Sequence, residues 1–190
     1  MKEEKYYHTK ESVDEYIKLA EGFSGNELIT SLKTFLPKKS TLLEIGSGPG
    51  TDWNILNKTY SVTGSDNSNA FINHLKSSNP NGEFIMLDAA TLKVDNKFDG
   101  IYSNKVLHHL TDNELKTSIL RQKELLNPNG IICHSFWKGE GDETFKGMYV
   151  KYHTQKALLG FFEEHFDLLV LENYQEFDAD DSILLIGRKK

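Results

Sequence analysis

From residue 41 onward, short apolar runs alternate with amphipathic stretches along the chain. Five runs are too short for helices and end abruptly at polar or glycine residues, so they predict β-strands over 41–46, 60–66, 83–88, 98–104 and 130–137. Between them, apolar residues three and four positions apart predict helices over 51–59, 68–79 and 111–127. Each of these helices opens with Ser or Thr, as an N-cap does. The alternation predicts an α/β fold, a Rossmann-like doubly wound sheet that is mostly parallel and has helices on both faces.

The two ends of the chain depart from this repeat. Ahead of the first strand, the pattern predicts two helices, 11–22 and 25–36. After Trp137 it predicts a glycine-rich loop, a helix and two strands, at 138–147, 154–165, 166–177 and 181–189. The short connection between the last two strands predicts an antiparallel hairpin with an antiparallel last strand.

We therefore expect one domain over residues 1–190. Its expected parts are an N-terminal helical cap, a cofactor-binding half, and an acceptor-side half with the terminal hairpin, at 1–40, 41–137 and 138–190. A chain of 190 residues with 38% hydrophobic content can bury one substantial core.

Composition narrows the expected partners and location. The net charge of −6 leaves no excess of positive charge to follow a phosphate backbone, so no nucleic acid partner is expected. Cys133 is the only cysteine and suits a reducing compartment. The start of the chain lacks the apolar core of a signal peptide, and no run approaches the roughly 20 apolar residues of a membrane span. We expect a cytoplasmic protein without membrane contact, either a monomer or a homodimer.

The chemistry centres on the segment LLEIGSGPGTD, residues 42–52. A strand that stops in glycines before a helix brings backbone N–H groups close to a ligand. The dinucleotide fingerprint requires Gly or Ala where this chain has Thr51, and the lysine of a phosphate-binding P-loop is missing. Glu44 and Asp52 border the turn and favour a ligand that is positively charged where it meets the loop.

At this segment the chain resembles the class I S-adenosylmethionine-dependent methyltransferases, whose first motif is similar to LLEIGSGPG. S-adenosylmethionine carries an ammonium and a sulfonium but no phosphate. Matching segments follow in the family's order as far as about residue 137. The resemblance implies that Asp66 takes the ribose hydroxyls, that Asp88 and Ala89 meet the adenine, and that Asn104 and Lys105 line the methionine end. The full set of expected cofactor-binding residues is Glu44, Gly46, Ser47, Gly48, Gly50, Asp52, Asp66, Asn67, Asp88, Ala89 and Asn104.

The resemblance implies methyl transfer from S-adenosylmethionine, with S-adenosylhomocysteine as the product. Because the small size leaves no appended recognition domain for RNA or protein, we expect a small-molecule acceptor. Two alternatives stay open. One is a nicotinamide-dependent oxidoreductase, which would share the sheet and the ribose acid. The other is a non-catalytic domain that binds S-adenosylmethionine and acts through a protein partner.

Candidate catalytic residues are fewer. A hydroxyl or protonated amine acceptor must lose a proton, and the candidate bases are His109, His108, His153 and Tyr102. No His, Cys or carboxylate spacing typical of metal ligands occurs, so no metal is expected. A further hypothesis places aromatic residues in a lid over the acceptor, namely Tyr6, Tyr7, Tyr149, Tyr152 and His153.

Overall fold

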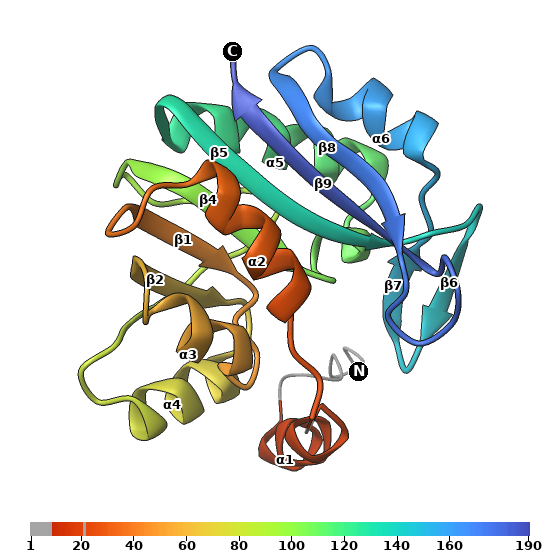
Figure 1. Cartoon of the computed structure of the whole chain (residues 1–190). Coiled ribbons are helices and arrows are strands. Elements are labelled where there is room, and N and C mark those ends of the chain that lie inside the picture. The colour runs from red at the N-terminus through yellow and green to blue at the C-terminus, as the bar shows by residue number, and fades with distance from the viewer. Residues whose placement is uncertain (1–8, 21) are drawn as a thin grey trace.

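The computed structural model describes residues 9–20 and 22–190 (Figure 1). Its main sheet has seven strands in the order β3-β2-β1-β4-β5-β9-β8. The strands are β1 (Thr41–Ile45), β2 (Ser61–Asp66), β3 (Glu83–Met86), β4 (Phe98–Asn104), β5 (Leu126–Trp137), β8 (Phe166–Tyr174) and β9 (Ser182–Lys189). The first five run parallel, and β9 is antiparallel to both of its neighbours. The predicted fold class and the antiparallel terminal hairpin are confirmed.

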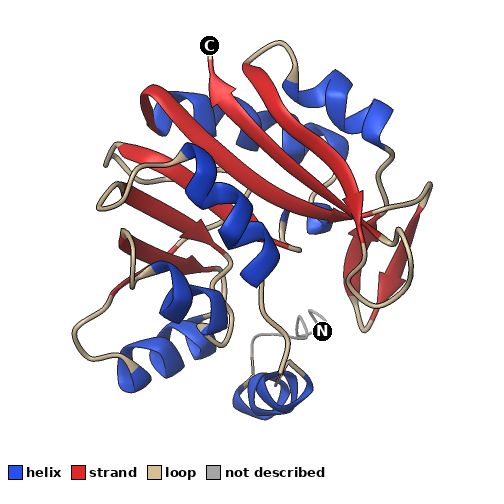
Figure 2. Ribbon diagram, in the orientation of Figure 1, coloured by secondary structure: helices blue, strands red, loops and turns tan. Residues whose placement is uncertain are grey.

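Helices cover both faces of this sheet (Figure 2). They are α1 (Lys10–Leu19), α2 (Asn26–Phe35), α3 (Thr51–Leu56), α4 (Asn69–Ser78), α5 (Asp112–Leu125) and α6 (Gln155–Phe162), with a 3₁₀ turn, η2, at Leu107–His109. Apolar side chains of α2, α3 and α4 pack together on one face of the sheet, and those of α5 and α6 form a second core on the other. A strand buried on both faces has apolar residues in succession, as ILLI does in β9; in β1 the buried run LLEI is interrupted by Glu44.

Local signals fix where several helices begin. Thr111 and Glu114 form the reciprocal hydrogen bonds of a capping box at the start of α5. The Ser68 hydroxyl accepts from the Phe71 N–H and is the N-cap of α4. Among the described residues, no helix is both long enough and apolar enough to cross a membrane.

The prediction of a loop over 138–147 is partly wrong. A separate two-stranded antiparallel hairpin is formed there by β6 (Asp142–Phe145) and β7 (Met148–Lys151), and it projects beside the end of the main sheet (Figure 1). All four residues of β6 are exposed. Because neither face of this strand is buried, its sequence carries no alternation of apolar and polar residues to reveal it.

Strand β5 is also longer than predicted, since it starts at Leu126 and not at residue 130. Its register with β4 shifts, because Phe98 pairs with Leu126 whereas Gly100 pairs with Ile131. The extra residues form an irregularity that interrupts the strand pattern.

Candidate functional site

The glycine turn after β1 uses backbone conformations that favour glycine. Gly46, Gly48 and Gly50 have φ values of +71°, +49° and +86°. A Cβ on Gly46 would lie 2.5 Å from Val106, and one on Gly50 would lie 2.7 Å from Leu75. A Cβ on Gly48 would instead meet nothing nearer than Tyr16, at 4.0 Å. The turn therefore packs tightly at two glycines and faces open space at the third.

Glu44 lies at the end of β1, beneath this turn. It is 2% exposed, and its Oε2 accepts a 2.6 Å hydrogen bond from the Ser47 hydroxyl. Burial raises the pKa of Glu44 to about 8; the Ser47 bond lowers it, and the negative charges of Asp52 and Asp66 raise it further. Near neutral pH the free protein therefore holds Glu44 mostly as the neutral acid.

Asp52 is engaged by internal donors. Its carboxylate accepts from the Gly25 N–H at 2.7 Å, the Tyr102 hydroxyl at 2.7 Å and the Asn104 amide at 3.1 Å. The side-chain amide oxygen of Asn104 in turn accepts from the Ser135 hydroxyl. These contacts tie the start of α2 to the ends of β4 and β5, so this carboxylate supports the site's frame.

Asp66 ends β2 and Asp88 follows β3, and both line the same cavity. Asp66 accepts from the Gly48 N–H at 3.0 Å and from the Ser68 N–H at 2.8 Å. The Oδ1 atom of Asp88 accepts from the backbone of Ala90 and from both the backbone and hydroxyl of Thr91, at 2.9 to 3.2 Å. Because Ser68 is the cap of α4, Asp66 is not needed for that purpose.

Two cavities open on either side of the glycine turn, at the carboxyl ends of the parallel strands where open α/β sheets bind ligands. The first, here called the Asp66 cavity, has a volume of about 470 Å³ and is lined by Asp66, Asn67, Asp88 and Ala89 among others. The second, the Trp137 cavity, has a volume of about 410 Å³ and is lined by Glu44, Ser47, Asp52 and Trp137 among others. Their linings share seven residues, Tyr16, Gly46, Gly48, Asn104, Lys105, His109 and Met148.

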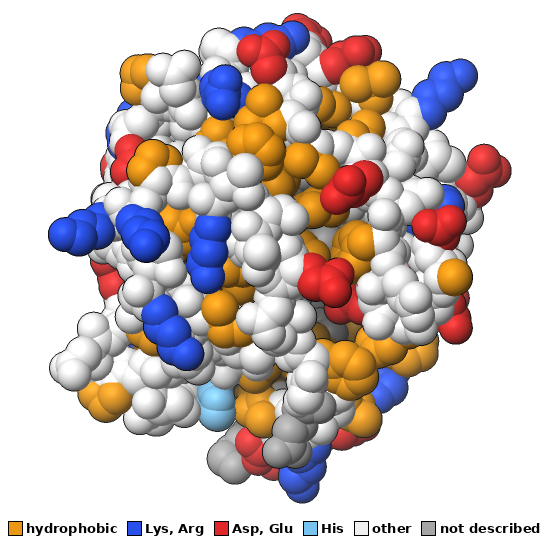
Figure 3. All heavy atoms as spheres, viewed as in Figure 1, with side chains coloured by type: hydrophobic (Ala, Val, Ile, Leu, Met, Phe, Trp, Pro, Cys, Tyr) orange, Lys and Arg blue, Asp and Glu red, His pale blue; other side chains and the backbone are white. Residues whose placement is uncertain are grey.

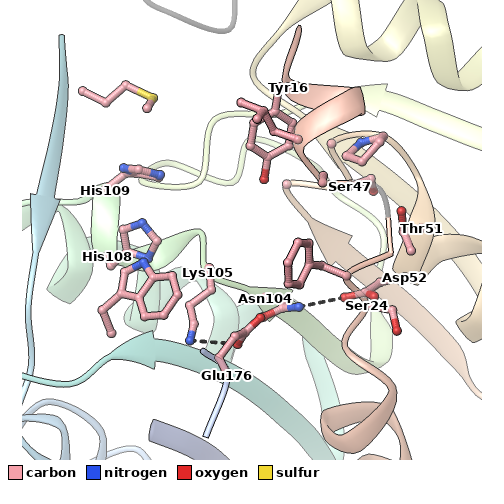
Figure 4. Close-up of a pocket in the computed structure, with 18 of the residues that line it drawn as sticks. Tyr16, Ser24, Ser47, Thr51, Asp52, Asn104, Lys105, His108, His109 and Glu176 are labelled. Carbon is pink, nitrogen blue, oxygen red and sulfur yellow. Dashed lines mark hydrogen bonds and ion pairs between the residues drawn. The ribbon is translucent and has the colours of Figure 1, made fainter. Parts of the chain in front are cut away.

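Figure 4 shows the Trp137 cavity from inside. His108, His109 and Lys105 lie on one side, while Tyr16, Ser47, Thr51 and Asp52 lie on the other. The Lys105 ammonium is 3.1 Å from the Glu176 carboxylate, donates to Tyr174 and Ser182, and lies 3.8 Å from the centre of the Trp137 ring.

The histidines of the site are neutral near pH 7, because burial lowers their pKa values. Burial lowers the pKa of His108 well below its usual value, assisted by the Lys105 ammonium and by His109 and His153 in their protonated forms. The pKa of His109 is lowered by burial and partly restored by its hydrogen bond with the Tyr149 carbonyl.

Three residues predicted for the site lie away from both cavities. Gly50 makes the left-handed turn before α3, where Leu75 leaves no room for a Cβ. Tyr102 is fully buried and its hydroxyl donates to Asp52, so this hydroxyl cannot take a proton from a methyl acceptor. His153 is 1% exposed and packs against Phe136 and Phe161.

The lid hypothesis is corrected in part. Tyr149 lines the Asp66 cavity, but Tyr152 and His153 line neither cavity, and the Tyr152 hydroxyl donates to Glu143 instead. Tyr6 and Tyr7 lie outside the described residues.

Sequence reasoning missed the aromatic walls of the Trp137 cavity. These side chains come from the α1–α2 region, the end of β5, the β6–β7 hairpin and the β8–β9 connection, and they are Tyr16, Phe23, Trp137, Phe145 and Phe177. Only Trp137 carried a signal, since it is the last residue of a strand that ends at the ligand-binding edge.

In the described part of the chain, no group of three or more His, Cys, Asp or Glu side chains is arranged to hold a metal ion. The polar groups around the cavities instead suit an organic ligand with a positive charge near Glu44 and hydroxyl groups near Asp66.

Comparison with known proteins agrees with this arrangement. Residues 42–130 match a family model described as a methyltransferase domain. The N-methyltransferase NodS of Bradyrhizobium japonicum, solved with S-adenosylhomocysteine, superposes with a TM-score of 0.75 at 19% identity, covering 98% of this chain and 99% of that one.

Two further structures have the same fold. A 1,6-didemethyltoxoflavin N1-methyltransferase from Burkholderia thailandensis gives a TM-score of 0.77 at 19% identity, covering 93% of this chain and 82% of its own. A methyltransferase from Methanosarcina mazei gives 0.74 at 17% identity, covering 84% and 96%. The family match and the sheet with its reversed last strand agree with the motifs from residue 42 onward. Residues 42–130 therefore match a methyltransferase domain, and the chain has the fold of the methyltransferase structures compared above.

Proposed function

We propose that the Asp66 cavity holds the adenosine part of S-adenosylmethionine and that the Trp137 cavity holds a small-molecule acceptor. The observation that carries this proposal is the wall common to the two cavities, which is formed by the glycine turn, the ends of β4 and η2, and one residue each of α1 and β7. A methyl group crossing from one cavity to the other would pass at this wall. Holding donor and acceptor in line there supplies an orientation effect worth up to about 7–11 kcal/mol.

The residues of the Asp66 cavity suit the adenosine part. Asp66 projects from the end of β2, where a carboxylate can accept from both ribose hydroxyls. The Oδ1 atom of Asp88 is occupied by the following turn, which leaves Oδ2 for the adenine amino group. Ala89 and Asn67 border the same cavity.

The glycine turn and Glu44 suit the methionine part. Gly48 faces open space, so a ligand can approach the backbone there. An ammonium or sulfonium near Glu44 favours its ionised form, so binding of a positively charged donor offsets the cost of burying that carboxylate.

The proposal also covers the class of methyl acceptor and the cellular location. The structural relatives include N-methyltransferases, one of them with the small molecule 1,6-didemethyltoxoflavin bound. The Trp137 cavity has the size of a small-molecule site. We place the protein in the cytoplasm, which suits a chain whose one cysteine is buried and unpaired. The three-part division into cap, cofactor half and acceptor half belongs to the same proposal.

Calorimetry with S-adenosylhomocysteine and with NAD tests the donor site. We expect S-adenosylhomocysteine to bind and NAD not to bind. In Asp66→Ala, the affinity for S-adenosylhomocysteine should fall about 10-fold or more, because a hydrogen bond to a charged group contributes roughly 1.5–3 kcal/mol.

The matched control is Glu164→Ala, which removes an exposed acid that lines neither cavity and should leave affinity unchanged. Unchanged affinity in Asp66→Ala would show that the ribose lies elsewhere. NAD binding in place of S-adenosylhomocysteine would favour the oxidoreductase alternative. Methyl transfer in a screen of hydroxyl, amine, thiol and carboxylate metabolites would exclude a purely non-catalytic role.

A further inference from the structure

His109 lies on the wall between the two cavities and has a fixed tautomer. Its Nδ1 is 2.8 Å from the Tyr149 carbonyl oxygen of β7. A carbonyl only accepts, so Nδ1 carries the hydrogen and Nε2 keeps its lone pair. Within the described residues no group is hydrogen-bonded to Nε2. His109 is thus a neutral proton acceptor at the place where donor and acceptor would meet.

The neighbouring His108 is less suited to this task. It lines the Trp137 cavity alone, and its Nδ1 is buried without a partner among the described residues. Nothing in the described structure therefore fixes its tautomer, as the Tyr149 carbonyl does for His109.

The Trp137 cavity has flat aromatic walls. The Trp137 and Phe177 rings are stacked at 26° with centroids 5.8 Å apart, and Phe23 meets Phe177 edge-on at 5.0 Å. Rings of this kind prefer another ring stacked on them or meeting them edge-on.

Apolar side chains are also left exposed around the mouth of this cavity. Leu19, Phe23, Phe145 and Phe177 are 48–61% exposed, although such side chains are usually buried. In Figure 3, hydrophobic side chains gather at the lower right, between α1 and the β6–β7 hairpin. An exposed apolar group of this kind marks a binding surface.

The cations of the same cavity and the Asp52 carboxylate are already paired, whereas Glu44 has the Ser47 hydroxyl as its partner. Lys105 directs its ammonium to Glu176, Tyr174 and Ser182. Three internal donors engage the Asp52 carboxylate, as described above. Lys146 pairs with Glu15 at 3.2 Å. An anionic acceptor would find no unpaired cation among the described lining residues, so burying it there would be unfavourable. A cationic acceptor would compete with the positively charged donor for Glu44.

We propose that the acceptor is an uncharged planar aromatic molecule with a weakly acidic O–H or ring N–H, and that His109 is the general base that removes this proton. The inference rests on the proposed function. The acceptor ring lies against Trp137 and Phe177, with its O–H or N–H toward His109. As the acceptor oxygen or nitrogen bonds the methyl carbon, the carbon–sulfur bond breaks and its electron pair stays on the sulfur of S-adenosylhomocysteine. The acceptor proton moves to Nε2 of His109 and then to solvent.

Binding to the S-adenosylhomocysteine complex tests the acceptor class. Three probes share one skeleton: 2-naphthol is flat and uncharged, 2-naphthoate is flat and anionic, and decahydro-2-naphthol is uncharged but not flat. We expect calorimetry to show 2-naphthol binding at least about tenfold more tightly than the other two. Phe177→Ala should weaken 2-naphthol binding, and Leu120→Ala, which truncates an exposed leucine on α5, should not.

Equal or tighter binding of 2-naphthoate or decahydro-2-naphthol would overturn the proposed acceptor class. If S-adenosylhomocysteine binds and 2-naphthol does not, this inference fails while the proposed function stands. If S-adenosylhomocysteine itself does not bind, the proposed function fails.

His109→Asn tests the base. The asparagine amide can still donate to the Tyr149 carbonyl but offers no basic nitrogen at the Nε2 position. We expect kcat for methylation of 2-naphthol to fall about 10²- to 10⁴-fold, with little change in the affinity for S-adenosylhomocysteine or 2-naphthol. The loss should be much smaller for 4-nitrophenol, a more acidic phenol that loses its proton more readily without a strong base.

An equal loss for both phenols would indicate a structural role and overturn the assignment of the base. So would an unchanged kcat for 2-naphthol. Failure of the wild-type protein to methylate either phenol would overturn the whole inference.

Discussion

At the scale of single residues, the glycine turn depends on an acid that is buried under it. Glu44 has almost no contact with solvent and one hydroxyl partner, Ser47. Its pKa rises from 4.5 to about 8, chiefly because burial penalises the charged form. Burial makes Glu44 neutral in the free protein, and a positively charged ligand beside it would favour loss of its proton.

Glu44→Gln should make stability less dependent on pH. The folded-state pKa is above the unfolded value, so the folded protein holds a proton that the unfolded chain releases between about pH 4.5 and 8. The stabilisation is therefore fully present below pH 4.5 and is lost as the pH rises through about 8. Glutamine has no such proton and can still accept from Ser47. We expect the variant to gain roughly 2–4 kcal/mol over the wild type as the pH rises across this window.

Urea unfolding at about pH 5, 6.5 and 8 measures this difference. Glu164→Gln changes an exposed carboxylate shortly after α6, so this variant serves as the control and should follow the wild type at each pH. A constant difference between Glu44→Gln and the wild type would show that Glu44 titrates normally.

At the scale of elements, a line of buried polar groups joins β4, β5 and α5 to the loop after β3. The Ser103 hydroxyl is 2.8 Å from Nδ1 of His134, and Nε2 of His134 is 2.8 Å from the Gln122 carbonyl oxygen. Gln122 donates to Ser118, and Ser118 donates to the backbone carbonyl of Ala89. Because the Gln122 oxygen only accepts, Nε2 carries the hydrogen and Ser103 donates to Nδ1. Burial lowers the pKa of His134 to about 3, which keeps this line uncharged.

His134→Phe should destabilise the fold. Phenylalanine keeps the ring contact with Phe162 but leaves Ser103 and Gln122 without their partner. Two unsatisfied buried groups predict a loss of about 2–4 kcal/mol in the free energy of unfolding. Phe161→Leu, a change at a partly buried ring outside this line, is the matched control and should cost less. A loss below about 1 kcal/mol in urea unfolding of His134→Phe would mean that the line contributes little.

At the scale of the whole molecule, the helices before β1, here called the cap, are joined to the sheet through Asp52. The carboxylate receives the Gly25 N–H, and a Cβ on Gly25 would lie 2.6 Å from its Oδ2. Any side chain at position 25 would clash with Asp52, so the close approach of this backbone to the Asp52 carboxylate requires glycine. Since Tyr16 and Phe23 of the cap line the cavities, this contact also positions part of the ligand-binding wall.

Asp52→Ala should loosen the cap relative to the sheet. The change leaves the Gly25 N–H, the Tyr102 hydroxyl and the Asn104 amide without their acceptor. We expect faster amide hydrogen exchange at Gly25 and in α2, together with a loss of about 2–4 kcal/mol in the free energy of unfolding. Amide hydrogen exchange in β9 should become faster only by the amount that the loss in the free energy of unfolding explains. Unaltered protection at Gly25 would contradict the assigned role of Asp52.

Local patterns in the sequence determined much of this protein. Alternating apolar and amphipathic runs predicted the parallel strands and crossover helices, because burial on both faces of a sheet requires continuous apolar residues. The close succession of the last two strands predicted their hairpin. The glycines after β1 and the acid ending β2 were recognisable because turn chemistry and strand ends are local properties.

Only the tertiary structure decided which of these residues face a ligand. It turned Asp52 inward onto Gly25 and Tyr102, fixed the tautomer of His109 through a carbonyl of β7, and built an aromatic cavity from Phe23, Trp137 and Phe177. Phe23 and Phe177 are in contact but lie far apart along the chain. No periodicity or spacing records such contacts, because they depend on how complete elements pack and not on the sequence around either residue.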